Sequence, residues 1–533
     1  MRSIGRHLSS LWILLFAAAG LIILPYPGIE CDEALFSTGL YAPTHTADSL
    51  PLGRTRIPIM LMSYVGALKT WLYAPWFRLW GPSAWSLRLP VLLLGGITIW
   101  LTALLAWRAA GTRAAWMALA LLSTDAVWLI TTCFDWGPVT LQHLLVVAAL
   151  SQSAEFYHTN RPRCLALACF FLGLGLWDKA IGAWMIAGLG IAVLLVYPKE
   201  VWERLTRRNL TVAAAAFCLG ALPLVVYNAR HSFETFRGNT RFSLRDAGQK
   251  IDLLRQTFGA NPTLGFIANY EPVGEAGQPG NAVERASLAL WEATGREASS
   301  PLLFLFLAAA VFLFFIRGTA AGRAGTFFCI VFWVAWLQML LTDGAGGGVH
   351  HTILLWPLPA LVIAVTFAEV SARRDWVRIA ASAAVLLTAG ANLLVTNDFL
   401  ARLVRNGTGT VWSDAVFALT RHLDETRPSQ VYVNDWGFLE TVRMLQRGRM
   451  PIDIGLDHFT LEEVTGEHLD HLRARLNVEG AVFVSYVDGR ESFPNVKRQV
   501  EEAAVAEGYR REHLATIPDR LGTPIFEVYR YAR

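Results

Sequence analysis

Charged residues are scarce in this chain. Only 17% of its 533 residues are Asp, Glu, Lys or Arg, whereas 54% are hydrophobic and the mean hydropathy is +0.39. Soluble domains carry about a quarter charged residues. The deficit therefore excludes an ordinary soluble enzyme and indicates a polytopic membrane protein with some polar parts. The formal net charge of +4 is small for this length and gives no support for nucleic-acid binding.

Cysteine is also sparse, and no two cysteines have the spacing of a metal knuckle. Most lie in apolar runs, where we interpret them as small apolar residues. Cys31 and Cys133 are expected near the same membrane face, but nothing in the pattern supports a disulfide between them. The glycine-rich stretch "DGAGGG" lacks the lysine and hydroxyl of a P-loop, so it predicts a flexible loop. The six cysteines are Cys31, Cys133, Cys164, Cys169, Cys218 and Cys329.

Long apolar runs are abundant instead. A membrane-spanning helix needs about 20 predominantly apolar residues. Runs that fit this requirement lie at about 8–26, 87–107, 113–132, 137–155, 163–177, 180–197, 209–227, 301–316, 324–341, 351–370 and 377–396. A further run, "IPIMLMSYVGALKTWLYAPWFRLW" at 57–80, is also long enough, and its placement decides the topology.

Positive charge in the short loops indicates how this further run lies. "RAAGTR", "HTNRPR", "PKEVWERLTRR", "RGTAAGR" and "SARRDWVR" are basic, whereas "CFDWGP", "WDK" and "TDGAGGGVHH" hold one lysine and no arginine. Lys and Arg mark the cytoplasmic side. All basic loops share that side with the N-terminus only if 57–80 lies along the surface, as an interfacial helix that Pro75 interrupts. Two alternatives stay open: a spanning helix at 57–80, and a cleaved signal peptide at the N-terminus.

The polar regions define the domains. We predict a membrane domain at 1–396, with a first external loop at 27–86 that holds the interfacial helix and a large external loop at 228–300. Residues 397–533 alternate strand-like and helix-like stretches, which predicts a small soluble α/β domain. An odd number of spans places this domain outside the cell membrane. The predicted fold is thus an all-α polytopic membrane protein of about 11 transmembrane helices with a small C-terminal α/β extracytoplasmic domain.

Ionisable residues gather at the ends of the predicted spans on the external side. Such groups are costly to leave unpaired at a membrane, so they mark structural pairs or a functional pocket. Each also has a structural explanation: Asp135 can cap a helix, Lys179 can reach the surface, and an acid can pair with Arg88. We expect Asp32 to be the working carboxylate and Glu33 to orient its neighbours. The predicted site residues are Asp32, Glu33, Arg56, Lys69, Arg88, Asp135, Lys179, His350 and His351.

Several of these stretches resemble one family. "CDEALFSTGLYA", "WSLRLPVLL" and "FDWGPVTL" are the most specific, and "YVGALKTWLYAPWFRLWG" and "HHTILLWPLPAL" fit more loosely. Their order resembles the GT-C membrane glycosyltransferases, in particular the family 39 group of protein O-mannosyltransferase-like and aminoarabinose-transferase-like enzymes. The resemblance covers roughly the first 400 residues. "RTRIP" stands where the family has a proline-lysine signature, and residues 397–533 show no such match.

The resemblance implies a donor in which a sugar is linked to a polyprenyl phosphate. An acceptor hydroxyl would attack the anomeric carbon with inversion, Asp32 would act as the base, and cationic residues would bind the leaving phosphate. Asp135 can bind the sugar, a divalent metal or the acceptor. No cofactor is certain, and the acceptor can be a lipid, a glycan or a protein. The alternatives from other classes are a lipid or sugar transporter (a flippase) and a membrane anchor for the α/β domain. The charges gather at one face rather than at the midplane where transporters bind their substrates.

Overall fold

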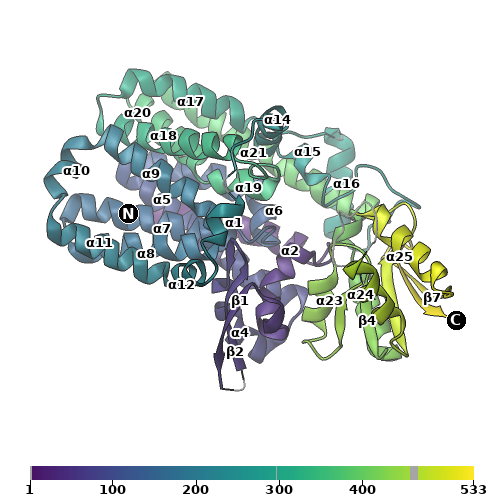
Figure 1. Cartoon of the computed structure of the whole chain (residues 1–533). Helices are drawn as coiled ribbons and strands as arrows, with labels where there is room; N and C mark the ends of the chain where they lie inside the picture. Colours follow the sequence, from purple (N-terminus) through teal and green to yellow (C-terminus); the bar gives the residue numbers. More distant parts are fainter. Residues whose placement is uncertain (1–2, 54, 240, 296, 456–465) are drawn as a thin grey trace.

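The computed structural model describes residues 3–533 except 54, 240, 296 and 456–465. Helices dominate the first 406 residues and form one bundle (Figure 1). Every apolar run predicted to span coincides with a helix or a pair of helices. The helices of the bundle are α1 (Ser3–Ile23), α5 (Ala84–Thr124), α6 (Ala126–Cys133), α7 (Thr140–Thr159), α8 (Pro162–Asp178), α9 (Ala183–Val196), α10 (Pro198–Arg204), α11 (Arg207–Gly220), α12 (Leu222–Arg230), α17 (Leu302–Ile316), α18 (Ala320–Leu341), α19 (Val349–Thr352), α20 (Leu358–Val370) and α21 (Asp375–Asn406).

The helices are more broken than the eleven predicted spans. In the described chain, four helices are long and apolar enough to cross a membrane, or up to six if two bent pairs count as one span each. The bent pairs turn by 101° between α9 and α10 and by 70° between α11 and α12. The predicted runs at 87–107 and 113–132 fall within α5 and α6, and the chain leaves helical geometry between them at Ala110 and Gly111. Glycine suits that break because its φ is +77°.

The first external loop differs from its prediction. Residues 57–66 are not helical, because β2 (Thr55–Met62) pairs with β1 (Asp48–Leu52) and β3 (Val65–Gly66) in an antiparallel sheet. The helix α4 (Leu68–Trp80) begins only afterwards, and it continues through Pro75 instead of ending there. The strand partner β1 precedes residues 57–80 in the sequence. The hydropathy pattern of residues 57–80 alone therefore does not reveal that β2 is a strand.

Helix α4 nevertheless has the two faces expected of an interfacial helix. It buries Lys69, Thr70, Tyr73 and Phe77 against the protein. Its other side exposes large apolar residues, as a helix lying in a membrane interface does. The exposed residues are Trp71, Leu72, Leu79 and Trp80.

The large loop at 228–300 is also helical. It forms α13 (Glu234–Asn239), α14 (Ala247–Gly259), α15 (Asn261–Leu264) and α16 (Ala282–Thr294). Helix α21 runs to Asn406, past the predicted domain boundary at 397, and the loop is joined to this extension. Asp398 on α21 accepts hydrogen bonds from Asn261 and Trp291 and pairs with Arg402 at 2.9 Å. These polar contacts stabilise the part of α21 that extends beyond its apolar segment.

The C-terminal domain is the α/β unit that the sequence predicted. Its sheet has the order β5-β4-β6-β8-β7, in which β4, β5 and β6 are parallel and β7 and β8 form an antiparallel edge. The final two strands and helix α22 were not predicted. One of the helix-like stretches, "LEEVTGEHLDHLRARL" at 461–476, lies partly outside the described residues, and its described part contains α24. The elements are α22 (Ala415–Thr426), β4 (Gln430–Val433), α23 (Leu439–Leu445), β5 (Ile452–Ile454), α24 (Glu467–Leu476), β6 (Ala481–Tyr486), α25 (Pro494–Ala506), β7 (Arg510–Pro518) and β8 (Pro524–Ala532).

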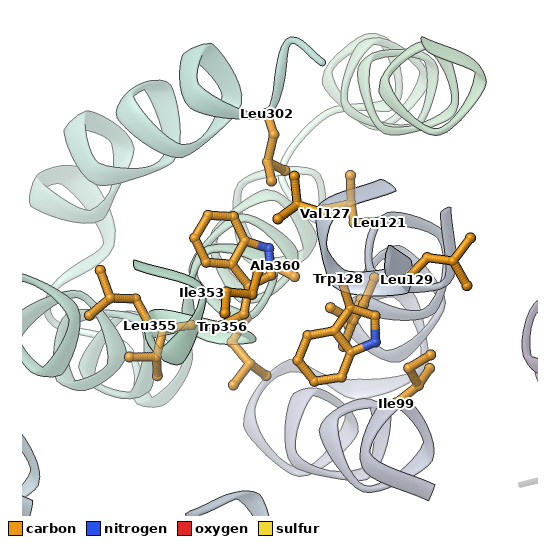
Figure 2. Close-up of a cluster of buried hydrophobic side chains, with 14 of the residues drawn as sticks. Ile99, Leu121, Val127, Trp128, Leu129, Leu302, Ile353, Leu355, Trp356 and Ala360 are labelled. Atoms are coloured by element: carbon orange, nitrogen blue, oxygen red, sulfur yellow. The ribbon is translucent and has the colours of Figure 1, made fainter. Parts of the chain in front are cut away.

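An apolar core supports the end of the bundle that carries Asp135, His350 and His351. Figure 2 shows side chains of α5 and α6 packed against the short 3₁₀ turn Ile353–Leu355 and the start of α20. Two bonds fix this packing. Asp125 caps α6 by accepting from the Trp128 N–H at 2.9 Å, and its other oxygen accepts from Trp356 Nε1 at 2.8 Å. The loop after α6 and the histidines of α19 are therefore held on one rigid support.

Candidate active site

Arg88 and Glu33 form a closed pair inside the protein. Both side chains are fully buried, and the guanidinium donates to the two carboxylate oxygens at 2.6 and 2.8 Å. Its remaining N–H groups donate to the carbonyls of Leu24, Pro27 and Gly28. All five donors of an arginine are thus in use. The predicted phosphate contact of Arg88 does not fit this geometry, whereas the orienting role predicted for Glu33 does.

Lys69 and Asp135 form a second closed pair. The Lys69 ammonium lies 2.6 Å from Asp135 Oδ2, and both side chains are buried. Asp135 Oδ1 accepts the backbone N–H groups of Val139 and Thr140, so it caps the start of α7. Lys69 also lies over the Phe36 ring, 4.5 Å from its centroid. These contacts agree with the structural explanation of Asp135 as a helix cap.

Asp32 is different from its neighbours. It lies on the short helix α2 (Cys31–Ala34) and is only partly buried. Within the described chain, its carboxylate makes no hydrogen bond and no ion pair. Glu30, which the sequence analysis did not select, is fully buried and accepts the Asp32 backbone N–H at 2.8 Å. Glu30 therefore orients the turn and leaves the Asp32 side chain available.

Lys179 and the two histidines lie beside one loop. Lys179 follows the last residue of α8, is buried, and donates to the Gly137 carbonyl. Gly137 has a φ of +67°, and a Cβ there would lie 2.6 Å from the His350 Cβ, so only glycine allows the histidine to approach. The rings of His350 and His351 lie 4.3 Å apart, and each has a buried Nδ1 without a hydrogen-bond partner. Both nitrogens therefore have unused hydrogen-bonding capacity.

Electrostatics link this group to Asp32. Burial raises the pKa of the Asp32 carboxyl above its usual value, the Lys179 ammonium opposes the rise, and Glu440 adds to it. Burial also lowers the pKa of Lys179 to about 8, although Asp32 favours its charged form. Asp32 and Lys179 thus stabilise each other's charge without touching. We call Asp32, Lys179, His350 and His351 the open cluster, because none of their side chains forms an ion pair within the described residues.

Arg56 makes no described hydrogen bond or ion pair with the other predicted site residues. It is exposed on β2, and its described hydrogen bonds go to the side chain and carbonyl of Ser49 on β1. No group of three or more His, Cys, Asp or Glu side chains in the described residues has an arrangement that could hold a metal ion. All six cysteines are free, Cys31 and Cys133 included.

The C-terminal domain directly contacts residues 28–34, which we call the acidic segment. Helix α23 lies beside α2 (Figure 1). Cys31 Sγ donates to Glu440 Oε2 at 2.9 Å, and Thr441 Oγ1 donates to the Ile29 carbonyl at 3.0 Å. More than 400 residues separate these partners, and Glu440 has no motif around it, so the sequence offers no signal for the contact.

Part of the chain matches a known protein family. Residues 66–227 match the family model described as dolichyl-phosphate-mannose-protein mannosyltransferase. This segment includes Lys69, Arg88, Asp135 and Lys179. None of the curated protein sequences compared matches the chain.

Solved structures match over nearly the whole chain. ArnT from Cupriavidus metallidurans bound to undecaprenyl phosphate is similar with a TM-score of 0.60 and 15% identity, over 97% of this chain and 98% of that one. The Archaeoglobus fulgidus oligosaccharyltransferase tethered with an acceptor peptide has a TM-score of 0.54 and 11% identity, over 100% and 74%. The archaeal oligosaccharyltransferase AglB from Archaeoglobus fulgidus, in complex with an inhibitory peptide and a dolichol-phosphate, has a TM-score of 0.51 and 13% identity, over 98% and 74%.

At these identities the structural likeness shows a shared fold. The predicted GT-C fold, a multi-pass membrane protein with a small C-terminal sheet domain, is confirmed. The predicted resemblance to GT-C glycosyltransferases is confirmed as well, because the family model and the matching structures are of that class. Together they support a membrane glycosyltransferase over the transporter and the anchor.

Proposed function

We propose that this GT-C protein is an inverting membrane glycosyltransferase that moves a sugar from a polyprenyl-phosphate donor to an acceptor hydroxyl. Asp32 is the base, and Lys179, His350 and His351 face the leaving phosphate. Arg88 with Glu33, and Lys69 with Asp135, hold the site in shape. The matching structures bound to undecaprenyl phosphate or dolichol-phosphate support the donor class.

One observation carries the proposal. Of the predicted acids Asp32, Glu33 and Asp135, the latter two have their oxygens engaged by Arg88 or by Lys69 and the α7 backbone. Asp32 is the predicted acid whose carboxylate has no partner, and it faces a cationic residue across the open cluster. A general base needs such an available lone pair, and a leaving phosphate needs positive charge where its own charge develops.

The proposed roles give the following reaction. The acceptor oxygen forms a bond to the anomeric carbon while its proton passes to the Asp32 carboxylate. The bond from that carbon to the phosphate oxygen breaks on the opposite face, so the configuration inverts. The phosphate keeps the electron pair, and the Lys179 ammonium and the imidazole N–H groups stabilise it by donating hydrogen bonds. The donor tail stays in the bilayer throughout.

The transfer itself is testable with full-length protein in liposomes. Radiolabelled polyprenyl-phosphate sugars and a panel of lipid, glycan and protein hydroxyl acceptors would be supplied, and the anomeric configuration of the product would be determined by NMR. We expect transfer with inversion. A product of retained configuration, or export of intact donor without transfer, would contradict the proposal.

Lys179 gives the proposal a pH signature. Its pKa of about 8 means that it is cationic below that pH and neutral above it. If the ammonium binds the donor phosphate, donor affinity falls as pH rises through about 8. In Lys179→Arg the guanidinium stays charged in this range, so this basic limb should disappear. Equilibrium binding of the labelled donor between pH 6 and pH 10 measures both proteins. If donor affinity of Lys179→Arg still fell at the same pH as in the wild type, the pH dependence would belong to another group.

We propose that the open cluster faces the extracytoplasmic side. The predicted cytoplasmic loops contact one another in pairs: Arg113 donates to Ser371, and Arg323 pairs with Glu200 at 2.6 Å. This pairing supports placing them together on the other side. Asp135 is too buried for labelling, so Gly347 is the better probe. After the exposed Cys218 is replaced, Gly347→Cys should react with an impermeant thiol reagent in intact cells, and Ala372→Cys only after permeabilisation. The reverse pattern would invert the topology.

A further inference from the structure

The acidic segment is held between the bundle and the C-terminal domain. On the bundle side, the Gly28 carbonyl accepts from Arg88. On the other side, the Gly28 N–H donates at 2.7 Å to the carbonyl of Trp412, in the connection between α21 and α22. A Cβ at Gly28 would lie 2.1 Å from the Ser413 carbonyl oxygen, so the backbones approach as closely as glycine allows. The position of the segment therefore depends on both parts of the chain.

Helix α23 supplies the most direct contacts to this segment. Met444 is fully buried in the same apolar cluster as Ile29, Ala34 and Phe36. Thr441 and Glu440 add the hydrogen bonds to the Ile29 carbonyl and the Cys31 thiol. Glu440 is thus fixed on the residue that directly precedes Asp32.

Charges that face Asp32 come from four elements. Glu30 and Glu33 belong to its own segment, and Glu33 is neutralised by Arg88. Lys179 approaches from the end of α8, and the Tyr64 hydroxyl from the turn between β2 and β3. Glu440 approaches from α23, with Arg443 as a distant partner at 3.8 Å. Glu440 is the negative charge that the C-terminal domain brings to the base.

We propose that Glu440 is a positioning residue for the transfer reaction: bonded to Cys31, it fixes the turn that carries Asp32 and sets the charge balance around that carboxylate. The C-terminal domain then takes part in catalysis through one side chain, although it does not contain the reacting groups. This inference rests on the proposed role of Asp32 as the base.

The sign of the effect follows from Coulomb's law. A nearby negative charge disfavours ionisation of Asp32 and so raises its pKa, which makes the carboxylate a stronger base once it is ionised. Glu440→Gln removes the charge but keeps an oxygen that can accept from the Cys31 thiol. The acid limb of the rate profile should therefore move to lower pH. Turnover on the plateau should fall by roughly two- to fivefold, because a weaker base is a poorer proton acceptor.

The experiment measures turnover against pH for full-length Glu440→Gln in liposomes, together with the donor KM. We expect the acid limb to shift and kcat to fall. The donor KM should stay unchanged, because Glu440 does not face the residues proposed to bind the donor phosphate. Glu440→Asp keeps the charge and should keep the wild-type acid limb. Glu425→Gln on the exposed end of α22 is the matched control and should change neither.

Two further variants separate the outcomes. Thr441→Val removes the neighbouring hydrogen bond without changing charge. If its acid limb shifted as much as that of Glu440→Gln, Glu440 would only help to dock the C-terminal domain, and the inference would be overturned. An unmoved acid limb in Glu440→Gln would overturn it as well. Asp32→Asn reports separately on the proposed function: if it lost turnover while Glu440→Gln behaved as wild type, only the inference would fail.

Discussion

Asp32→Asn should lose about a hundred- to ten-thousand-fold in turnover while donor affinity stays near that of the wild type. Removal of a general base typically costs this much. Asparagine has nearly the same shape but cannot take the hydroxyl proton. The structure adds a reason to expect a clean result: the Asp32 side chain has no described hydrogen bond or ion pair that the substitution could break. Folding should therefore be unaffected.

Measurement of kcat, donor affinity and the thermal midpoint of the same preparation tests this expectation. Glu33→Gln is the contrasting variant, because it leaves Arg88 buried without its counter-charge and should lower the midpoint. If Asp32→Asn kept most of its turnover, the acid pair would be only a hydrated helix end. If Glu33→Gln lost turnover at an unchanged midpoint while Asp32→Asn did not, the two roles would be reversed.

Arg88→Ala should destabilise the protein by about 3–5 kcal/mol, since breaking a buried ion pair strands the remaining charge. Here the loss includes three backbone carbonyls that would have no donor. Arg88→Lys keeps the charge but not the planar fork, and an ammonium has three donors instead of five. It should fall between wild type and Arg88→Ala. The yield of monodisperse protein and its thermal midpoint in detergent measure the effect.

The matched control is Arg108→Ala. Arg108 pairs with Glu155 at 2.9 Å, but about a third of each side chain is exposed. Exposed pairs contribute about 0–1 kcal/mol, so this variant should remain close to wild type. If Arg88→Ala folded as stably as Arg108→Ala and lost only donor affinity, Arg88 would bind the phosphate after all, as the sequence pattern suggested.

The sequence by itself determined the membrane class, the positions of the apolar helices and the end of the bundle where charge gathers. These follow from hydropathy and from the distribution of arginine and lysine, which act locally and repeat along the chain. Asp32 was selected on the same grounds, because an acid directly after an apolar run must be hydrated, paired or functional. The three parallel strands of the C-terminal domain were also predictable from their alternation with helices.

Tertiary structure alone decided which charges are open. Lys69, Arg88, Asp135 and Lys179 look alike as ionisable residues of the predicted external side, yet two closed pairs engage the first three of them. Which acid pairs with which base depends on how distant elements pack together. The paired residues are 55 and 66 positions apart in the sequence, so no local sequence pattern encodes the pairing. The same holds for β2, whose strand partner lies outside its own run, and for Glu440, which reaches Cys31 across 409 positions. Local composition fixes where a charge is placed, but only packing fixes what neutralises it.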